Sequence, residues 1–527
     1  MRAFAWLFEG RPDPPGHLWP RWIFLRALGG IYFSAFYSLN YQIRGLIGPD
    51  GILPAGRYLE AVAQSVGPWE RLWYAPTLLW WSSGTLVLDA LCIGGMAASL
   101  LLVLNFWPRG TLALSFVCFL SFVAAAQDFS SYQSDGMLLE AGFLALFFAP
   151  SGLRPGLGRL HPPSRASLYL LQWEWFRIYF ESGVVKLLSG DPEWRHFTAM
   201  DEYYQNGPLP TWIAYYVQHL PHAFHAATVG ATLALELALV FLMFLPRPFR
   251  IACFFIVTPW QLGVILTANY AFLNYLVLAM GVLLLDDRFL ARFLPARFRE
   301  KGAPIPEPSA ASTAGGLGDR LRQPWKALGL ATSAMCLTWV GYVTIARLVW
   351  LFARAPFPVF PVAAVEPFRI ANQYGLFAVM TRGRYEIEFQ GSADGQQWVA
   401  YPFRYKAQAL DRAPRIFAPY QPRLDWNLWF ASLGSWREHT IVPNLEIRLL
   451  QNDRDVLKLF GGNPFAQDPP RVIRVLLWQY WFTSLTEHRE TGRWWRRELL
   501  GLFAPTLERT KAGELKVVDW PTVGPRG

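Results

Sequence analysis

Long apolar runs separated by short polar loops occupy most of the chain before residue 354. Nine of these runs are long enough, or nearly so, to cross about 30 Å of hydrocarbon as tilted helices. They cover residues 22–40, 76–103, 111–127, 136–149, 167–187, 223–245, 250–267, 269–285 and 327–353. The fourth run is short and the two runs after residue 250 could form one broken span, so eight is the alternative count. The pattern predicts an α-helical polytopic membrane bundle.

From about residue 360 the pattern changes to that of a water-soluble domain. Residues 385–389 alternate apolar and polar, 392–395 form a turn signal, and 398–405 alternate again, which predicts a β-hairpin. Residues 445–450 and 472–477 are further strand candidates, although the second could be helical. Residues 494–502 are typical of a short basic helix. A β-rich soluble C-terminal domain is therefore expected after the bundle.

These patterns divide the chain into five parts. Residues 1–300 form the membrane bundle, and 301–326, rich in Pro, Ala, Gly and Ser, form a flexible inner linker. Residues 327–353 form the last membrane helix, 354–510 the outer domain and 511–527 a loose tail.

Composition narrows the class of protein. Hydrophobic residues make up 53% and charged residues 16% of the chain, which excludes a large soluble enzyme. All four cysteines lie in apolar runs without a zinc-binding spacing, so the outer domain forms no disulfide. HExxH, GxSxG, P-loop and complete GxGxxG motifs are absent from the sequence. We expect no soluble active site, no metal and no cofactor.

Basic residues gather on one side of the predicted bundle. With the N-terminus inside, the inner loops hold seventeen of them and the short outer loops only four. The inner set is Arg2, Arg11, Arg21, Arg109, Arg154, Arg159, Arg165, Arg247, Arg250, Arg288, Arg292, Arg297, Arg299, Lys301, Arg320, Arg322 and Lys326; the outer set is Arg44, Arg57, Arg71 and Arg195. The positive-inside rule then predicts a cytoplasmic N-terminus and a C-terminal domain outside. The net charge of +10 reflects this topology rather than nucleic-acid binding.

Ionisable residues interrupt the run 167–187. Glu174, Arg177 and Glu181 are spaced three and four apart, so they share one helix face and can neutralise one another. Such groups cost about 2.5–3.5 kcal/mol each at mid-membrane, so they indicate either function or a paired polar seam. Glu140 and Glu236, with Asp89, add carboxylates that could partner Arg26 or Arg177. The predicted seam is Glu140, Glu174, Arg177, Glu181 and Glu236.

Lys186 lies near the outer end of the same run, off that face. One interpretation is a snorkelling lysine whose ammonium reaches the interface. The other is a desolvated lysine able to act as a base. His219, His222 and His225 follow an aromatic loop at intervals of three, but this spacing drifts around a helix and favours no metal site.

Several stretches resemble the lipase maturation factor family. The central one is SGVVKLLSGDPEWRHFTAMDEYYQNGPLPTWIAYYVQHLP at 182–221. Others occur in family order at 44–55, 132–148, 372–398, 415–434, 463–465 and 494–501. The resemblance implies a polytopic membrane protein that assists folding and assembly of secreted lipases in the endoplasmic reticulum, with the region after the last span in the lumen.

Two features favour a bacterial setting for such a protein. Arginine greatly outnumbers lysine, which is typical of a GC-rich genome, and the outer domain lacks both cysteine and Asn-x-Ser/Thr sequons. The corresponding location is the inner membrane, with the soluble domain in the periplasm.

A second, shorter resemblance bears on mechanism. Residues 179–187, YFESGVVKL, are similar to a segment of the vitamin K-dependent gamma-glutamyl carboxylases in which the lysine is the catalytic base. This likeness implies an alternative function, a membrane enzyme that uses Lys186 as base on a lipophilic substrate. A transporter is a second alternative, against which the lack of an inverted repeat argues.

The first hypothesis is a non-enzymatic assembly factor that presents its outer domain to a client. Its expected partners are membrane lipid and a secreted client protein such as a lipase, with the oligomeric state left open. The client surface is expected in the loop 189–210 and in residues 421–426. Its candidate residues are Asp191, Trp194, Asp201, Tyr204, Arg423, Asp425 and Trp426.

Overall fold

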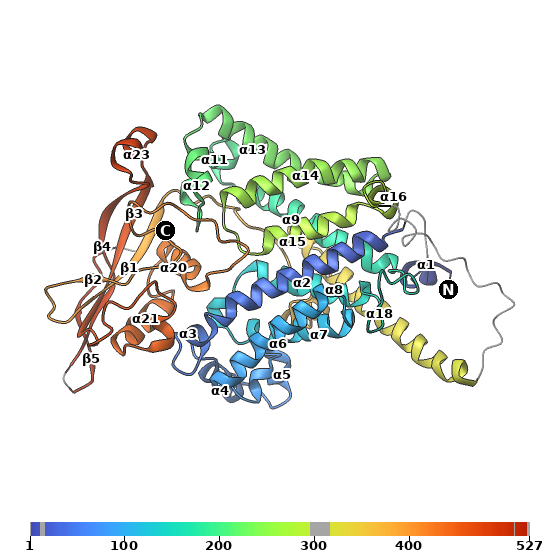
Figure 1. The fold of residues 1–527 in the computed structure, drawn as a ribbon, viewed down its shortest axis with the longest axis horizontal. Coiled ribbons are helices and arrows are strands. Elements are labelled where there is room, and N and C mark those ends of the chain that lie inside the picture. The colour runs from blue at the N-terminus through green and yellow to red at the C-terminus, as the bar shows by residue number, and fades with distance from the viewer. Residues whose placement is uncertain (1, 11–15, 296–316, 511, 524–527) are drawn as a thin grey trace.

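A computed structural model describes residues 2–10, 16–295, 317–510 and 512–523. It has a helical bundle and a C-terminal sheet domain (Figure 1). The sheet domain lies at one end of the bundle, and the N-terminus lies at the other. This confirms the predicted fold class in its coarse form, a helical N-terminal region followed by a domain built on an antiparallel sheet.

Every predicted membrane segment contains a helix. The long ones are α2 (Leu18–Asn40), α6 (Thr85–Val103), α7 (Pro108–Val123), α8 (Gln133–Phe148), α9 (Arg165–Leu188), α13 (His222–Leu237), α14 (Arg247–Thr267), α15 (Leu273–Gly281) and α18 (Leu317–Trp350). Short 3₁₀ helices η3 (Leu239–Phe244) and η4 (Val282–Leu284) extend α13 and α15. The predicted segment 76–103 is broken, because η1 (Leu78–Trp80) precedes α6.

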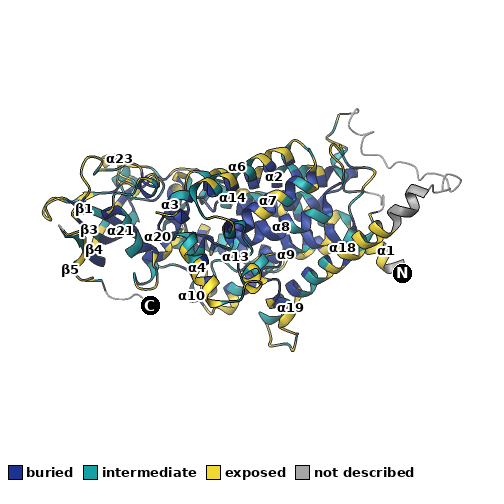
Figure 2. Ribbon diagram, turned by 90° about the horizontal axis from the view of Figure 1, so that it is seen from below, coloured by how far each residue is buried: buried dark blue, intermediate teal, exposed yellow. Residues whose placement is uncertain are grey.

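Only five helices in the described ranges are both long and apolar enough to cross a membrane. They are 18–40, 85–103, 222–244, 247–267 and 327–350. The predicted count of about nine spans is therefore not confirmed. Helix α8 has 16 residues and α9 carries several charges, and both lie deep in the bundle, where neighbouring helices shield their polar groups (Figure 2).

Short helices close the two ends of the bundle. Near the N-terminus lie α1 (Arg2–Phe8) and α16 (Asp287–Leu290). At the end that faces the sheet lie α3 (Ile43–Ile47), α10 (Pro192–Arg195), α11 (Ala199–Asn206), α12 (Trp212–Gln218) and η2 (Gln127–Ser130). Two more, α4 (Ala55–Ser65) and α5 (Glu70–Tyr74), follow α3.

The C-terminal domain is a five-stranded antiparallel sheet in the order β2-β1-β3-β4-β5. The strands are β1 (Arg384–Ser392), β2 (Val399–Ala400), β3 (Val472–Phe482), β4 (Trp495–Arg509) and β5 (Leu515–Asp519). The segment between β2 and β3 contains α20 (Arg423–Leu433), α21 (Ile441–Leu450) and α22 (Arg454–Leu457), and α23 (Leu485–Thr491) joins β3 to β4. Helices α19 (Phe360–Ala363) and η7 (Glu366–Phe368) lead from α18 toward the sheet.

The structure confirms the strand at 472–477 and the predicted hairpin, although the second strand of the hairpin covers only Val399–Ala400 of the predicted 398–405. Two other elements are corrected. Residues 445–450 belong to helix α21, in which Ile441, Leu445 and Leu449 recur at intervals of four and are buried. This helical period outweighs the short β-like run. Residues 494–502, predicted as a basic helix, lie almost entirely in β4, where Arg497 pairs with Tyr480 of β3. Tertiary pairing overrides the local helical pattern there.

Parts of the predicted linker and tail form regular structure. Residues 301–316 lie outside the described residues, and α18 already begins at Leu317. In the tail, residues 515–519 form β5 and pair with β4. Residues 511 and 524–527 lie outside the described residues.

Candidate functional site

Arg177 is the centre of a buried polar cluster between α8 and α9. Its guanidinium forms an ion pair with Glu140 and donates to the backbone oxygen of Asn372 at 2.6 Å. Glu181, one turn along α9, lies 3.8 Å away. The second oxygen of Glu140 accepts from the Asn372 amide at 2.7 Å. The cluster therefore joins two helices of the bundle to the segment that leads into the sheet.

The predicted seam is formed only in part. Arg177 and Glu181 face each other as expected, and Glu140 supplies the main carboxylate. Glu174 forms no hydrogen bond to Arg177: both of its oxygens are buried without a well-formed hydrogen bond in the described part of the chain. Glu236 does not belong to this cluster, because its partner is Lys186.

Lys186 is buried and turns inward. Its Nζ lies 2.7 and 2.9 Å from the two carboxylate oxygens of Glu236 on α13 and 2.6 Å from Ser182 Oγ. The ring of Trp194 covers it at 5.1 Å. Only 3% of the residue is exposed, so the snorkelling interpretation is wrong.

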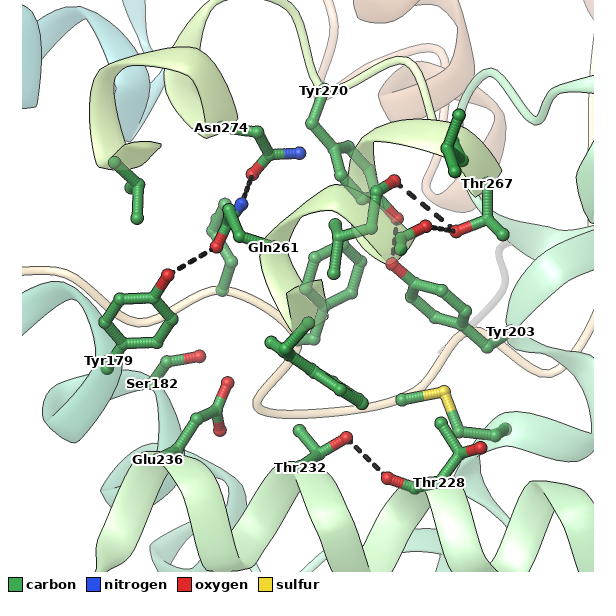
Figure 3. A pocket seen from close by; sticks show the side chains of 18 of the residues that line it. Tyr179, Ser182, Tyr203, Thr228, Thr232, Glu236, Gln261, Thr267, Tyr270 and Asn274 are labelled. Atoms are coloured by element: carbon green, nitrogen blue, oxygen red, sulfur yellow. Dashed lines mark hydrogen bonds between the residues drawn. The ribbon is translucent and has the colours of Figure 1, made fainter. Parts of the chain in front are cut away.

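The Lys186–Glu236 pair lies in the wall of a cavity of about 540 Å³. Helices α9, α13, α14 and α15 surround the cavity, and α11, α12 and residues 374–377 close it toward the sheet domain. Figure 3 shows Tyr179, Glu236 and Tyr203 pointing into it from different sides. Most of the remaining lining is apolar or aromatic, so the cavity suits an amphiphilic molecule.

A short polar chain crosses the upper wall of the cavity. Tyr179 donates to Gln261 Oε1 at 2.6 Å, and Gln261 Nε2 donates to Asn274 Oδ1 at 2.8 Å (Figure 3). On the opposite side Tyr270 donates to the Tyr203 hydroxyl at 2.8 Å. These bonds fix the direction in which each polar group faces the cavity.

A second buried ion pair attaches the sheet domain to the bundle. Arg423, at the start of α20, forms two hydrogen bonds of 2.7 and 2.8 Å with Asp135 of α8, and a third of 2.6 Å with the carbonyl of Phe129. Neither side chain of the pair is exposed. The guanidinium also lies 4.7 Å from the ring of Phe122. The contact is dry and bidentate, the geometry that arginine favours.

Residues 372–380, hereafter the strap, run between the bundle and the sheet domain. The Tyr374 amide donates to Glu181 at 2.6 Å, and the Met380 amide donates to Asp191 at 2.6 Å. The indole of Trp194 donates to the carbonyl of Phe377 at 3.0 Å. Bundle side chains therefore hold the strap along its whole length.

The client-surface candidates lie mainly in this junction. Asp191, Trp194, Tyr204, Arg423, Asp425 and Trp426 are all buried. Asp201 is partly exposed and contacts His222 Nδ1 at 2.9 Å. In this conformation Asp191, Trp194, Arg423 and Trp426 contact residues across the junction. The role of the seven residues toward a client stays a prediction.

Asp425 shows how the sheet domain treats a buried carboxylate. It accepts from the amides of Tyr405 at 3.2 Å and Lys406 at 3.1 Å. Burial raises the pKa of Asp425 to about 6, although these amides and the Lys406 ammonium act in the opposite direction. The Asp425 side chain therefore holds the backbone at residues 405–406 and is not part of an exposed surface.

The three histidines do not converge. His219 lies between the carbonyls of Tyr215 and Thr483, His222 contacts Asp201, and His225 is buried. Across the ranges that the structure describes, no three His, Cys, Asp or Glu side chains are grouped as metal ligands.

Sequence reasoning missed the polar residues that join the two parts. Asn269 holds the carbonyls of Leu209 and Arg415 and the amide of Phe417. Gln42 binds the backbone of both Gln421 and Arg423. Each is a neutral amide beside an apolar run, a signal too common to single out. Asn372 could have been found, because it begins one of the resembling stretches.

Comparison with known proteins agrees with this division. The lipase maturation factor transmembrane domain family matches residues 19–292, and the lipase maturation factor C-terminal domain family matches residues 370–505. The first match ends at residue 292, before α18, and the second begins at residue 370, next to the strap. No solved structure matches the chain.

Relatives from vertebrates match nearly the whole chain. Lipase maturation factor 2 of Gallus gallus is 33% identical, covering 94% of this chain and 82% of its own length. Lipase maturation factor 2 of Homo sapiens is 32% identical over 93% and 82%, and lipase maturation factor 1 of Bos taurus is 33% identical over 97% and 94%. These relatives are eukaryotic and give no support to a bacterial origin. With both domain families matched in order, the chain belongs to the lipase maturation factor family.

Proposed function

We propose that this protein is a membrane-embedded maturation factor that assists the folding of secreted proteins such as lipases. One observation carries the proposal: relatives named lipase maturation factors align along both the bundle and the sheet domain, over more than nine-tenths of the chain. The function therefore uses the two parts together rather than a single module.

The junction supports a role for the sheet domain as a fixed platform. Arg423 binds Asp135, Asp191 binds the strap, and Arg384 donates to the carbonyls of Gly207 and Pro208. Because these contacts are buried and join several segments of the bundle to the sheet domain, the domain stays at a set position over the end of the bundle. A client is met by exposed surface around the junction, whose position Asp191, Trp194, Arg423 and Trp426 fix.

The distribution of basic residues supports one orientation. Arg21 donates to the carbonyls of Leu157 and His161, and Arg247 pairs with Asp286, so four predicted inner segments lie at the end away from the sheet (Figure 1). The N-terminus is cytoplasmic and the sheet domain lies outside, in the lumen of the endoplasmic reticulum or, in a bacterial host, in the periplasm.

Labelling with a membrane-impermeant maleimide tests this orientation. Trp520→Cys places a thiol beside β5 at an exposed site, and Arg292→Cys places one at the opposite end. Spheroplasts should label the first variant from outside and the second only after permeabilisation. Sealed microsomes, whose outer face is cytoplasmic, should label the second from outside and the first only after permeabilisation. The opposite result in either preparation would invert the topology.

The enzymatic alternative assigns Lys186 as a base, and the geometry argues against it. Ser182 Oγ and both oxygens of Glu236 surround Nζ, which matches the three hydrogen bonds of an ammonium group. Lys186→Arg keeps a cation beside Glu236. A maturation factor should retain client maturation with this change, whereas an enzyme that needs this base should lose it.

Client maturation itself is the direct test. Disrupting the gene in its host should lower the activity of secreted lipase per mole of secreted lipase protein, and restoring the wild-type gene should recover it. An unrelated secreted hydrolase serves as the control and should keep its specific activity. Unchanged lipase activity per mole in the disrupted host would refute the proposed function.

A further inference from the structure

The cavity that holds the Lys186–Glu236 pair opens sideways between two membrane-spanning helices. Four of its lining residues, Phe224 on α13 and Pro259, Gly263 and Leu266 on α14, are exposed. Both helices are long and apolar enough to cross a membrane. Gly263 has no atom within 4 Å of where a side chain would begin. The opening therefore faces the hydrocarbon region, and a molecule entering there comes from the bilayer.

Asn274 and Tyr374 place polar groups without a described partner in the wall of the cavity. Asn274 uses its side-chain oxygen to accept from Gln261, while its amide nitrogen has no hydrogen bond in the described part of the chain (Figure 3). The Tyr374 hydroxyl likewise bonds to no described residue. Both residues line the cavity and each is only 8% exposed. A buried donor without an acceptor costs about 1–3 kcal/mol, so a ligand that supplies acceptors is favoured.

The charge of the lining limits the ligand further. Lys186 and Glu236 are the only Lys, Arg, Asp or Glu residues among the residues described as lining the cavity, and they neutralise each other. An additional charge would enter an apolar space without a counter-ion, which is strongly unfavourable. The head of the ligand is therefore neutral and rich in acceptor oxygens.

We propose that this cavity binds a neutral single-chain lipid from the membrane, with the ester or carbonyl oxygens of its head facing Asn274 and Tyr374. The acyl chain lies along the apolar lining and leaves through the opening at Gly263. A cavity of about 540 Å³ lies within the range of about 300–1,000 Å³ for small-ligand sites and accommodates one chain rather than a two-chain phospholipid. This site is independent of the proposed maturation function.

Photolabelling of the purified full chain in nanodiscs tests the proposal. The probe is a monoacylglycerol with a diazirine on its acyl chain, and labelled peptides are mapped by mass spectrometry. Label is expected on α13 and α14. Unlabelled mono-oleoylglycerol should compete, whereas oleylamine and oleate at equal concentration should compete at least about tenfold less, because each carries a charge.

Matched variants locate the site. Gly263→Phe fills the opening and should reduce labelling about tenfold or more. Gly94→Phe makes the same change on α6, at another helical glycine with open space around it, and should leave labelling within about twofold. Tyr374→Phe combined with Asn274→Leu removes both free donors and should reduce labelling by about three- to tenfold.

Several results would overturn the proposal. These are equal labelling of the Gly263 and Gly94 variants, label spread evenly over all lipid-facing helices, or competition by oleate as strong as that by mono-oleoylglycerol. The competition series uses the wild-type protein, so it decides the question even if a variant does not fold.

Discussion

Two of the buried ion pairs of this protein, Arg423–Asp135 and Lys186–Glu236, differ in their surroundings. Arg423–Asp135 is enclosed by the sheet domain and the bundle, and the two terminal guanidinium nitrogens donate to Asp135 and to a backbone carbonyl. Lys186–Glu236 has comparable distances but lies in the wall of a cavity that opens between α13 and α14. Similar chemistry is thus used once to close an interface and once to line a space.

The difference lies in what remains when one partner is removed. At the junction, a lone charge is trapped between two packed parts with no solvent to reach it. At the cavity, water or a lipid head can approach the remaining group. The stability lost when one partner is removed therefore depends more on the surroundings of the ion pair than on its distances.

The largest effect is expected at the junction. Arg423→Met leaves Asp135 buried without a counter-ion and should lower stability by about 3–5 kcal/mol. Thermal unfolding of the detergent-solubilised protein, followed by limited proteolysis at the strap, measures this. The double variant Arg423→Met with Asp135→Leu should recover most of the loss. If the single and double variants unfold alike, the pair is not what holds the sheet domain in place.

A smaller effect is expected at the cavity. Lys186→Met leaves Glu236 beside accessible space, so the cost should be about 1–3 kcal/mol. The same thermal measurement compares it with Arg423→Met under identical conditions. Equal losses of stability at the two sites would show that the cavity wall is as closed as the junction. The two ion pairs would then not differ in their surroundings.

Glu446 sharpens the comparison because it is buried and has no partner among the described residues. Burial raises the pKa of Glu446 well above its ordinary value of 4.5. Above that pH the unfolded chain releases a proton that the native state keeps, so stability falls as pH rises. Glu446→Met should raise stability by about 1–3 kcal/mol at pH 7, with little gain near pH 4. A gain that does not change with pH would contradict this account.

The smallest effect is expected at a surface pair. Arg471 and Glu508 pair on the sheet at 2.6 Å, but the arginine side chain is 59% exposed. Arg471→Met should therefore change stability by no more than about 0.5 kcal/mol. This variant is the baseline against which the other three unfolding measurements are compared, and a loss above about 1 kcal/mol would show that exposure does not set the order.

Much of the fold was predictable because long apolar runs and alternating apolar and polar residues can be recognised directly in the sequence. The nine runs, the hairpin at 385–400 and the strand at 472–477 all follow from periodicity. The helix α21 was missed because Leu445–Leu450 fits both the period of a strand and that of a helix. The burial of Ile441 together with Leu445 and Leu449 shows that the helical period applies. Strand β4 was missed because its pairing with β3 lies outside any local window.

The candidate site was predictable only as a list of residue types. The spacing of Arg177 and Glu181 placed both on one helix face, and the structure agrees. Their partners Glu140 and Asn372 come from distant segments, so no spacing rule connects them. The pairing of Lys186 with Glu236 joins residues fifty positions apart on two helices. Which charges meet is a property of packing, and packing is not local.

The strap takes part in both regions at once. Tyr374 and Phe377 line the cavity, while the backbone of Tyr374 and Met380 is held by Glu181 and Asp191. Two events that share one segment are thermodynamically linked, and the linkage is reciprocal. A molecule that binds against Tyr374 stabilises the docked domain by the same free energy by which docking strengthens its binding. With the proposed lipid bound there, the lipid composition of the membrane becomes an allosteric input to the sheet domain.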